Sequence, residues 1–343
     1  MQSRQPGIDL LRCLGLLFVT GVHSFLYNGY YYEPQMGILM WGANSFKWLF
    51  FTCNGLFMLL TGYLKCEKPL SKGYYRSLLP ILVGYGLTCL VSFPIRYFVL
   101  NEKLPLWQWL EKMVTFGNYA WYIEMYIGLI LISPLINLAL KQLTTPKQIY
   151  WAAGAMVAVS ALHSITPLDL IPDYWSALYP LAYYVIGASI RKLQPKCRPG
   201  LFLTLAAGFT MWLGLLTLIT TDGGASDGFG QGYGGFWVMV IITFVFLGLY
   251  RIKIGPRVAR VLAWLSGGVF EGYILSRLLD VWLYGMLPQW HKPELYPLLF
   301  LCVTLPIFTL SILAGKALHE LAQRLCRPKQ KAGKFEVQKT PSA

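Results

Sequence analysis

The sequence has little charge and little histidine. Of its 343 residues only 13% are Asp, Glu, Lys or Arg, and only four are histidine. A soluble domain carries about 25% charged residues. Hydrophobic residues make up 56% of the chain, and the mean hydropathy is +0.50. This composition excludes an ordinary soluble domain and predicts an all-α polytopic membrane protein that lies in a lipid bilayer.

The motifs of several familiar chemistries are also missing. The histidines are scattered, with His291 in an outer loop and His319 in the tail, and no HxxxH pattern or carboxylate cluster indicates a metal site. A serine hydrolase would need a GxSxG elbow between a strand and a helix; residues 224–228 read GASDG but lie in a glycine-rich outer loop, so we expect no such elbow. The seven cysteines have neither metal-ligand nor redox spacing. We therefore expect no metal ion and no disulfide.

About ten segments could cross a bilayer, which takes about 20 mostly apolar residues. They are residues 8–29, 41–63, 78–100, 119–140, 149–165, 175–190, 200–220, 233–250, 261–285 and 295–315. We expect one transmembrane domain over residues 1–320 and a basic, flexible cytoplasmic tail over residues 321–343.

The basic residues predict the orientation of these spans. If the N-terminus is cytoplasmic, 22 of the 29 Lys and Arg residues lie in inner segments, against Lys103, Lys112 and Lys292 outside. The positive-inside rule then predicts that both termini are cytoplasmic. The net charge of +14 therefore reflects topology, and we expect no nucleic-acid partner.

The first span contains Asp9, Arg12 and His23. Charged or titratable groups cost roughly 2.5–3.5 kcal/mol each at the centre of a membrane helix, so they usually face a protein interior or a watered cavity. Eleven residues make close to three helical turns, which places Arg12 and His23 on one face, roughly 16 Å apart. Asp9 precedes Arg12 by three residues and can pair with it.

Other polar residues lie in or beside later spans. Glu124 is expected to be buried near the outer end of the fourth span, and Glu271 near mid-membrane in the ninth. Arg277 and Asp280 are three residues apart and can pair with each other. Lys72 and Arg76, four residues apart before the third span, form either a basic flank that sets topology or a phosphate clamp.

These residues allow general-base chemistry by one buried histidine, because the pKa of histidine suits removal of a proton from a hydroxyl during acyl transfer. A proton-coupled transporter would use the same residue types. In a third alternative, His23, Glu124 and Glu271 only form interhelical hydrogen bonds in a non-catalytic scaffold.

The sequence resembles the membrane-bound acyltransferase 3 family. Arg12 and His23 match its Arg-x10-His motif, and four segments resemble it in the same order: GIDLLRCLGLLFVTGVHSF, GLFMLLTGYL, WYIEMYIGLILISPL and LYPLAYYVIGASI. The resemblance covers residues 7 to 315.

The resemblance implies an acyltransferase in the bacterial plasma membrane. It would move an acyl group, usually acetyl, from cytoplasmic acyl-CoA to a hydroxyl of a cell-surface polysaccharide or a lipid-linked glycan. It assigns activation of the hydroxyl to His23 and binding or positioning of the donor to Arg12. A transporter or flippase of a lipid-linked sugar or small polar solute is the alternative. The acceptor sugar, the acyl chain and the oligomeric state are not readable from the sequence.

The chain departs from the family pattern at two places. Many members have two arginines three apart before the third span, where this chain has Lys72 and Arg76, with Ser77 at the place of an arginine. These two residues are nevertheless our candidates for donor binding. Many relatives also have a second histidine in the ninth span, which here reads Tyr273-Ile-Leu-Ser276. Glu271 is therefore the candidate for orienting His23 or holding the acceptor, and Glu124 is a further catalytic candidate.

Overall fold

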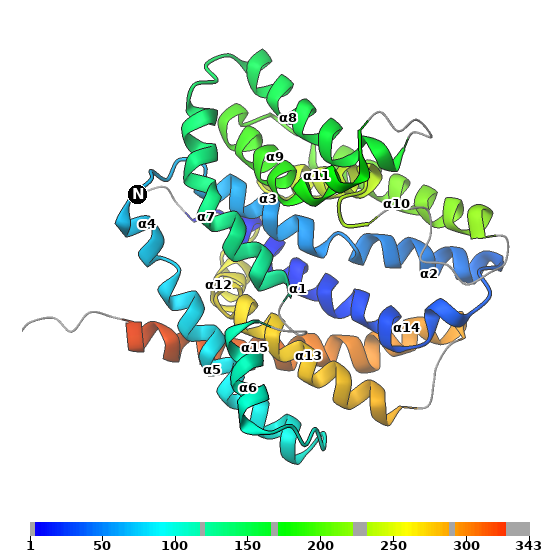
Figure 1. Ribbon diagram of the computed structural model, residues 1–343. Coiled ribbons are helices and arrows are strands. Elements are labelled where there is room, and N and C mark those ends of the chain that lie inside the picture. Colours follow the sequence, from blue (N-terminus) through cyan, green and yellow to red (C-terminus); the bar gives the residue numbers. More distant parts are fainter. Residues whose placement is uncertain (1–3, 117–120, 166–170, 222–231, 288–291, 327–343) are drawn as a thin grey trace, which may run out of the picture.

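Figure 1 shows the computed structural model of the chain, which describes residues 4–116, 121–165, 171–221, 232–287 and 292–326. Within these ranges the structure is helical and contains no strand. The helices are α1 (Pro6–Tyr27), α2 (Gly37–Phe50), α3 (Cys53–Lys65), α4 (Lys72–Arg76), α5 (Leu79–Phe98), α6 (Leu106–Val114), α7 (Trp121–Lys141), α8 (Pro146–Ala161), α9 (Tyr179–Leu193), α10 (Pro199–Thr221), α11 (Phe236–Leu249), α12 (Pro256–Leu265), α13 (Val269–Met286), α14 (Tyr296–Leu299) and α15 (Leu305–Cys326). Short helical turns join some of them, including η4 (Ser266–Gly268) between α12 and α13 and a π-helical turn, η6 (Phe300–Thr304), before α15.

The predicted all-helical fold class is confirmed, and the molecule has the helices of a multi-pass membrane protein. Six helical segments of the described chain are long and apolar enough to cross a bilayer, and α11 is a shorter apolar helix. The six are Pro6–Tyr27, Lys72–Phe98, Trp121–Lys141, Pro199–Thr221, Pro256–Met286 and Pro293–Cys326. The other predicted spans coincide with the shorter helices α2, α3, α8, α9 and α11. The count of ten spans and the cytoplasmic location of both termini stay predictions.

The predicted second span, residues 41–63, is interrupted. Helix α2 ends at Phe50 and α3 begins at Cys53. Between them, both the backbone N–H and the hydroxyl of Thr52 donate to the carbonyl of Leu49, at 3.2 and 2.6 Å. A hydroxyl that bonds a nearby carbonyl in this way competes with the regular helical hydrogen bonds, so one apolar segment forms two short helices.

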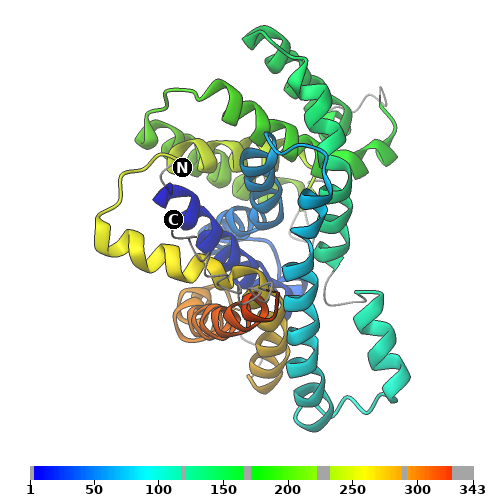
Figure 2. The same ribbon diagram turned by 90° about the vertical axis from the view of Figure 1, so that its left-hand side faces the viewer.

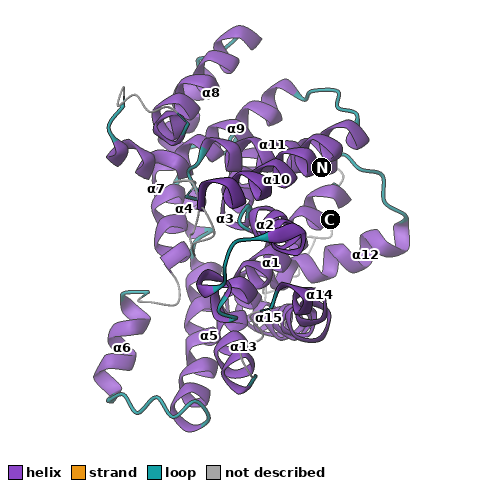
Figure 3. Ribbon diagram, turned by 90° about the vertical axis from the view of Figure 1, so that its right-hand side faces the viewer, coloured by secondary structure: helices purple, strands orange, loops and turns teal. Residues whose placement is uncertain are grey.

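Helix α1 lies in the middle of the bundle. It contacts α2, α3, α11, α12, α13 and α15, and Figures 2 and 3 both show it enclosed by other helices. Of the six candidate spans it is the most deeply buried, with 61% of its apolar window inside the protein. A polar side chain on α1 therefore meets protein on most sides instead of lipid.

Glycines allow two helix pairs to approach closely. On α3 and α9, a Cβ on Gly62 would meet the carbonyl of Tyr184, and one on Gly187 would meet the carbonyl of Leu59. On α13 and α15, a Cβ on Gly272 would meet the carbonyl of Ser311, and one on Gly315 would meet the backbone nitrogen of Gly272. Small residues are typical of tightly packed membrane helices, where van der Waals contact drives association.

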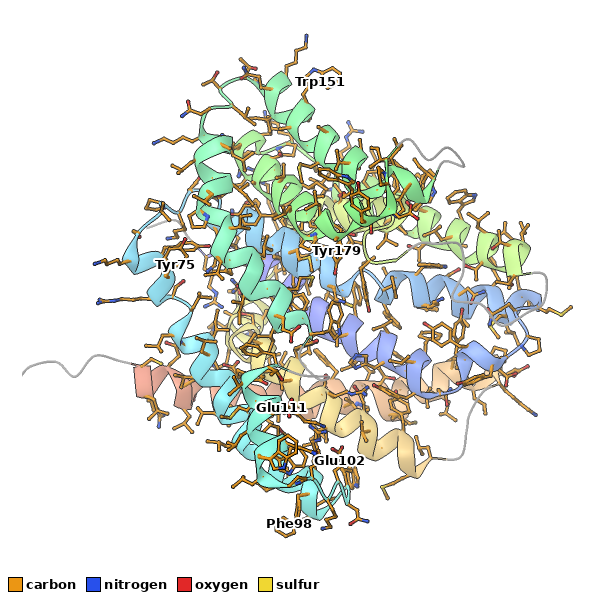
Figure 4. All side chains as sticks on the ribbon, in the orientation of Figure 1. Tyr75, Phe98, Glu102, Glu111, Trp151 and Tyr179 are labelled. Carbon is orange, nitrogen blue, oxygen red and sulfur yellow. The ribbon has the colours of Figure 1, made fainter. Side chains whose placement is uncertain are left out.

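The outer surface of the bundle is apolar and aromatic. Figure 4 shows Trp151 at the edge of α8 and Phe98 at the end of α5, both directed away from the bundle. They are 70% and 76% exposed. Large apolar side chains that are exposed to water promote aggregation, whereas in a bilayer the same side chains contact lipid.

The predicted domain boundary at residue 320 falls inside a helix. Helix α15 continues to Cys326, so the first residues of the predicted tail, and His319 before them, belong to the helical bundle. Residues 327–343 lie outside the described part of the chain.

We expect Gly187→Val to destabilise the protein, because the added side chain cannot fit against the backbone of α3. Overpacking of a well-packed core typically costs about 1–3 kcal/mol. The unfolding temperature of the detergent-solubilised protein would measure this effect. Gly154→Val on α8 is the matched control, since nothing lies within 4 Å of the added Cβ. Equal unfolding temperatures for the two variants would contradict the packing argument.

Candidate functional site

Helix α1 carries the residues that the sequence analysis placed on one face. Pro6 occupies its first turn, where a missing N–H costs nothing. The helix ends before Gly29, whose φ of 74° is left-handed. Near the start of α1, Gly7 lies directly against the carbonyls of Leu249 and Tyr250. These contacts fix the N-terminal end of α1 against α11.

A histidine–aspartate pair joins α1 to α13. His23 Nδ1 lies 2.6 Å from Asp280 Oδ2. An ionised carboxylate can only accept hydrogen bonds, so the His23 Nδ1–H donates. The Asp280 side chain is fully buried, and 20% of the His23 side chain is exposed. The pair therefore fixes the imidazole with its other nitrogen, Nε2, available to accept a proton.

Two further side chains lie beside this pair. The Tyr27 ring packs edge-on against the His23 ring, with 5.9 Å between centroids. The Arg277 guanidinium carbon lies 4.5 Å from the centroid of the Tyr27 ring. Arg277 precedes Asp280 by three residues on α13, so a positive charge lies near the buried carboxylate.

At the other end of α1 the carboxylate of Asp9 joins three groups. Arg4 donates to both of its oxygens, at 2.7 and 2.9 Å, and the Ser266 hydroxyl donates to Oδ1 at 2.8 Å. Arg12 Nη1 lies 3.5 Å from Oδ1, and the Asp9 side chain is only 3% exposed. The predicted pairing of Asp9 with Arg12 is thus present, within a network that also reaches η4.

A cavity of about 530 Å³ opens beside this network. Its lining includes three basic side chains, those of Arg12, Lys65 and Lys68, and a histidine, His319. Among the described residues that line it there is no Asp or Glu. Of the Arg12 side chain, 37% is exposed. The cavity is therefore suited to an anionic ligand.

In the described part of the chain, five phenylalanine and tyrosine side chains line the cavity, and three of them, Phe57, Tyr122 and Tyr273, pack against one another. Phe57 lies against Gly15, which is one turn beyond Arg12 on α1. Its ring centroid is 5.9 Å from that of Tyr122, which in turn is 5.6 Å from that of Tyr273. Neither His23 nor Asp280 is among the described residues that line the cavity. Phe57 contacts α1 at a level between Arg12 and His23.

Glu271 is buried as predicted, with 1% of the residue exposed, but its partner is not His23. Its Oε1 lies 3.1 Å from Nδ1 of His319 on α15. The sequence analysis had placed His319 in the tail and offered Glu271 for orienting His23. In the structure, Asp280 makes the hydrogen bond that orients His23.

The other predicted site residues lie apart from the histidine–aspartate pair. Glu124 on α7 is exposed, whereas the sequence analysis expected it to be buried. Lys72 and Arg76 are exposed on the five-residue helix α4 and do not line the cavity, whereas Lys65 and Lys68 from the end of α3 and the following turn do.

Sequence reasoning missed Asp280 as the partner of His23. One signal was present, because a carboxylate in the same polar helix as Glu271 needs a partner. Its nearest candidate was Arg277, and the choice between Arg277 and His23 depends on how α13 lies against α1. No group of three or more His, Cys, Asp or Glu residues that could hold a metal ion is found in the ranges that the structure describes.

Comparison with known proteins identifies the family of the chain. A sequence model of the acyltransferase 3 family, described as an acyltransferase domain, matches residues 5–316. No curated protein and no solved structure matches the chain. The matched range includes α1, the histidine–aspartate pair and most of the residues that line the basic cavity. Because the match covers far more than half of its length, the chain belongs to the acyltransferase 3 family.

Proposed function

We propose that the protein is a multi-pass O-acyltransferase of the bacterial plasma membrane. It would move an acetyl or another short acyl group from cytoplasmic acyl-CoA to a hydroxyl of a cell-surface polysaccharide or a lipid-linked glycan. The observation that carries the proposal is the 2.6 Å bond between His23 and Asp280. His23 lies on the same central helix, α1, as Arg12, and Arg12 lines the basic cavity.

His23 is the general base in this proposal. Its Nε2 accepts the proton of the acceptor hydroxyl as the hydroxyl oxygen attacks the carbonyl carbon of the thioester. The C=O electron pair moves to the oxygen and then returns as the C–S bond breaks. The thiolate of CoA leaves with the proton that His23 returns, so the histidine is regenerated. Asp280 keeps the imidazole oriented and stabilises its cationic form.

Arg12 is the donor-binding residue. The guanidinium binds phosphate through two parallel hydrogen bonds, and Lys65 and Lys68 add positive charge along the same cavity. Roughly 16 Å of helix separates Arg12 from His23. The extended pantetheine arm spans this separation, so that the phosphates bind near Arg12 while the thioester passes the aromatic rings to reach His23.

The transporter alternative is not favoured, because the family to which the chain belongs is one of acyltransferases. A flippase would also move its solute without consuming acyl-CoA. Release of free CoA thiol from acetyl-CoA, by membranes that contain the protein and its native glycan, separates the two activities.

We expect His23→Ala to lower acyl transfer at least about 100-fold, the usual contribution of a positioned acid or base. Asp280→Asn should lower it at least about 10-fold, because the oriented imidazole loses its charged partner. The measurement is CoA release together with incorporation of labelled acetyl. The matched controls are His163→Ala and Asp173→Asn, which change the same residue types away from the site. Transfer at the wild-type rate by His23→Ala would refute the mechanism.

We expect Arg12→Ala to weaken acetyl-CoA binding about 10- to 100-fold, since a hydrogen bond to a charged group contributes about 1.5–3 kcal/mol. His23→Ala should bind as tightly as wild type. Calorimetry on the protein in detergent measures both values. Arg257→Ala, which removes an exposed arginine of α12, is the control for charge alone. The donor assignment fails if Arg12→Ala and Arg257→Ala bind acetyl-CoA equally well.

A further inference from the structure

The structure contains a second histidine–carboxylate pair that the proposed mechanism does not use. Glu271 on α13 and His319 on α15 lie 3.1 Å apart, and 2% and 30% of their side chains are exposed. As with His23, the bonded nitrogen is Nδ1, which leaves Nε2 free of the carboxylate. Helix α13 therefore contacts two histidines in the same way: Glu271 bonds Nδ1 of His319, and Asp280, nine residues later, bonds Nδ1 of His23.

The second pair lies at the depth of Arg12. Ser266, which bonds Asp9 beside Arg12, is followed by Gly267, and a Cβ on Gly267 would lie 3.6 Å from Cδ2 of His319. Arg12, Ser266, Gly267 and His319 all line the basic cavity. The cavity thus receives a guanidinium from α1 and an imidazole from α15 at the same level.

The carboxylate of Glu271 is buried inside the bundle, so its bond to His319 is not a solvent-exposed ion pair. A carboxylate as buried as that of Glu271 is costly unless it is paired, and the other oxygen, Oε2, has no hydrogen-bond partner among the described residues. With both ring nitrogens protonated, His319 donates Nδ1–H to Glu271 and can donate Nε2–H to an anion. Other charged groups nearby are Arg12, Lys65 and Lys68, which line the same cavity, and, on its own helix, Lys316, which pairs with Glu320 at 3.3 Å.

We propose that His319 is a further donor-binding residue, whose Nε2–H contacts a phosphate of acyl-CoA opposite Arg12, and that Glu271 is its positioning residue. This inference rests on the proposed function and deepens it, because it names a second group that recognises the phosphate-bearing part of the donor. A phosphate between Arg12 and His319 is contacted from two helices that are far apart in the sequence. The thioester end of the donor has no part in this contact.

The test compares two donors that share the thioester arm. Acetyl-CoA carries phosphates and S-acetylpantetheine carries none. We expect His319→Ala to weaken acetyl-CoA binding about 10- to 100-fold, the loss of one charged hydrogen bond, and to leave S-acetylpantetheine binding unchanged. Calorimetry measures the first value, and displacement of bound acetyl-CoA the second. Glu271→Gln should change acetyl-CoA binding in the same direction by a smaller factor. His163→Ala is the matched control and should bind both donors as wild type does.

The outcomes are distinguishable. An equal loss of affinity for both donors means that His319 only supports the fold, and an unchanged affinity for acetyl-CoA means that it does not touch the donor; either result overturns the inference. In both cases the proposed function stands as long as wild type binds acetyl-CoA and His23→Ala abolishes transfer. If wild type binds neither donor, the proposed function itself fails.

Discussion

A carboxylate inside a membrane helix bundle has to be paired, and this requirement determines how the helices around α1 are aligned. Asp9 joins α1 to η4 through Ser266, Asp280 joins α13 to α1 through His23, and Glu271 joins α13 to α15 through His319. Removing one partner of a buried pair typically costs about 3–5 kcal/mol. A shift of α13 by one turn along either neighbour would break two of these contacts at once. The register of the three helices is therefore set by charge, while glycines set how closely they approach.

The same contacts give α13 a central role beside α1. Its two carboxylates, nine residues apart, stand roughly 13 Å from each other along the axis. Arg12 and His23 on α1 are separated by a similar length. The two helices therefore offer polar groups at two matching levels, with aromatic rings between them. An extended substrate that reacts at one end and is held by its charges at the other fits this spacing.

Much of the fold and part of the site could be predicted from the sequence. Hydropathy located the helical segments, and helical periodicity placed Arg12 and His23 on one face of α1, because both depend only on neighbours along the chain. The partner of His23 could not be predicted, since it depends on the register of α13 against α1. Glu271 was correctly expected to be buried, yet burial alone does not say which histidine it meets. His319 was missed because the helix continues through a segment whose charge resembles that of a tail.

The aromatic rings of Phe57, Tyr122 and Tyr273 have a consequence for the membrane as a whole. A protein that receives one substrate from each side of a bilayer contains the two halves of a pore. An open path between them would let ions move down the membrane potential, each releasing about 2.3 kcal/mol per 100 mV. In the proposed mechanism the packed rings of Phe57, Tyr122 and Tyr273, which line the basic cavity, would narrow this path around the acyl arm. The proposed enzyme would thus exchange an acyl group across the bilayer while limiting the flow of ions.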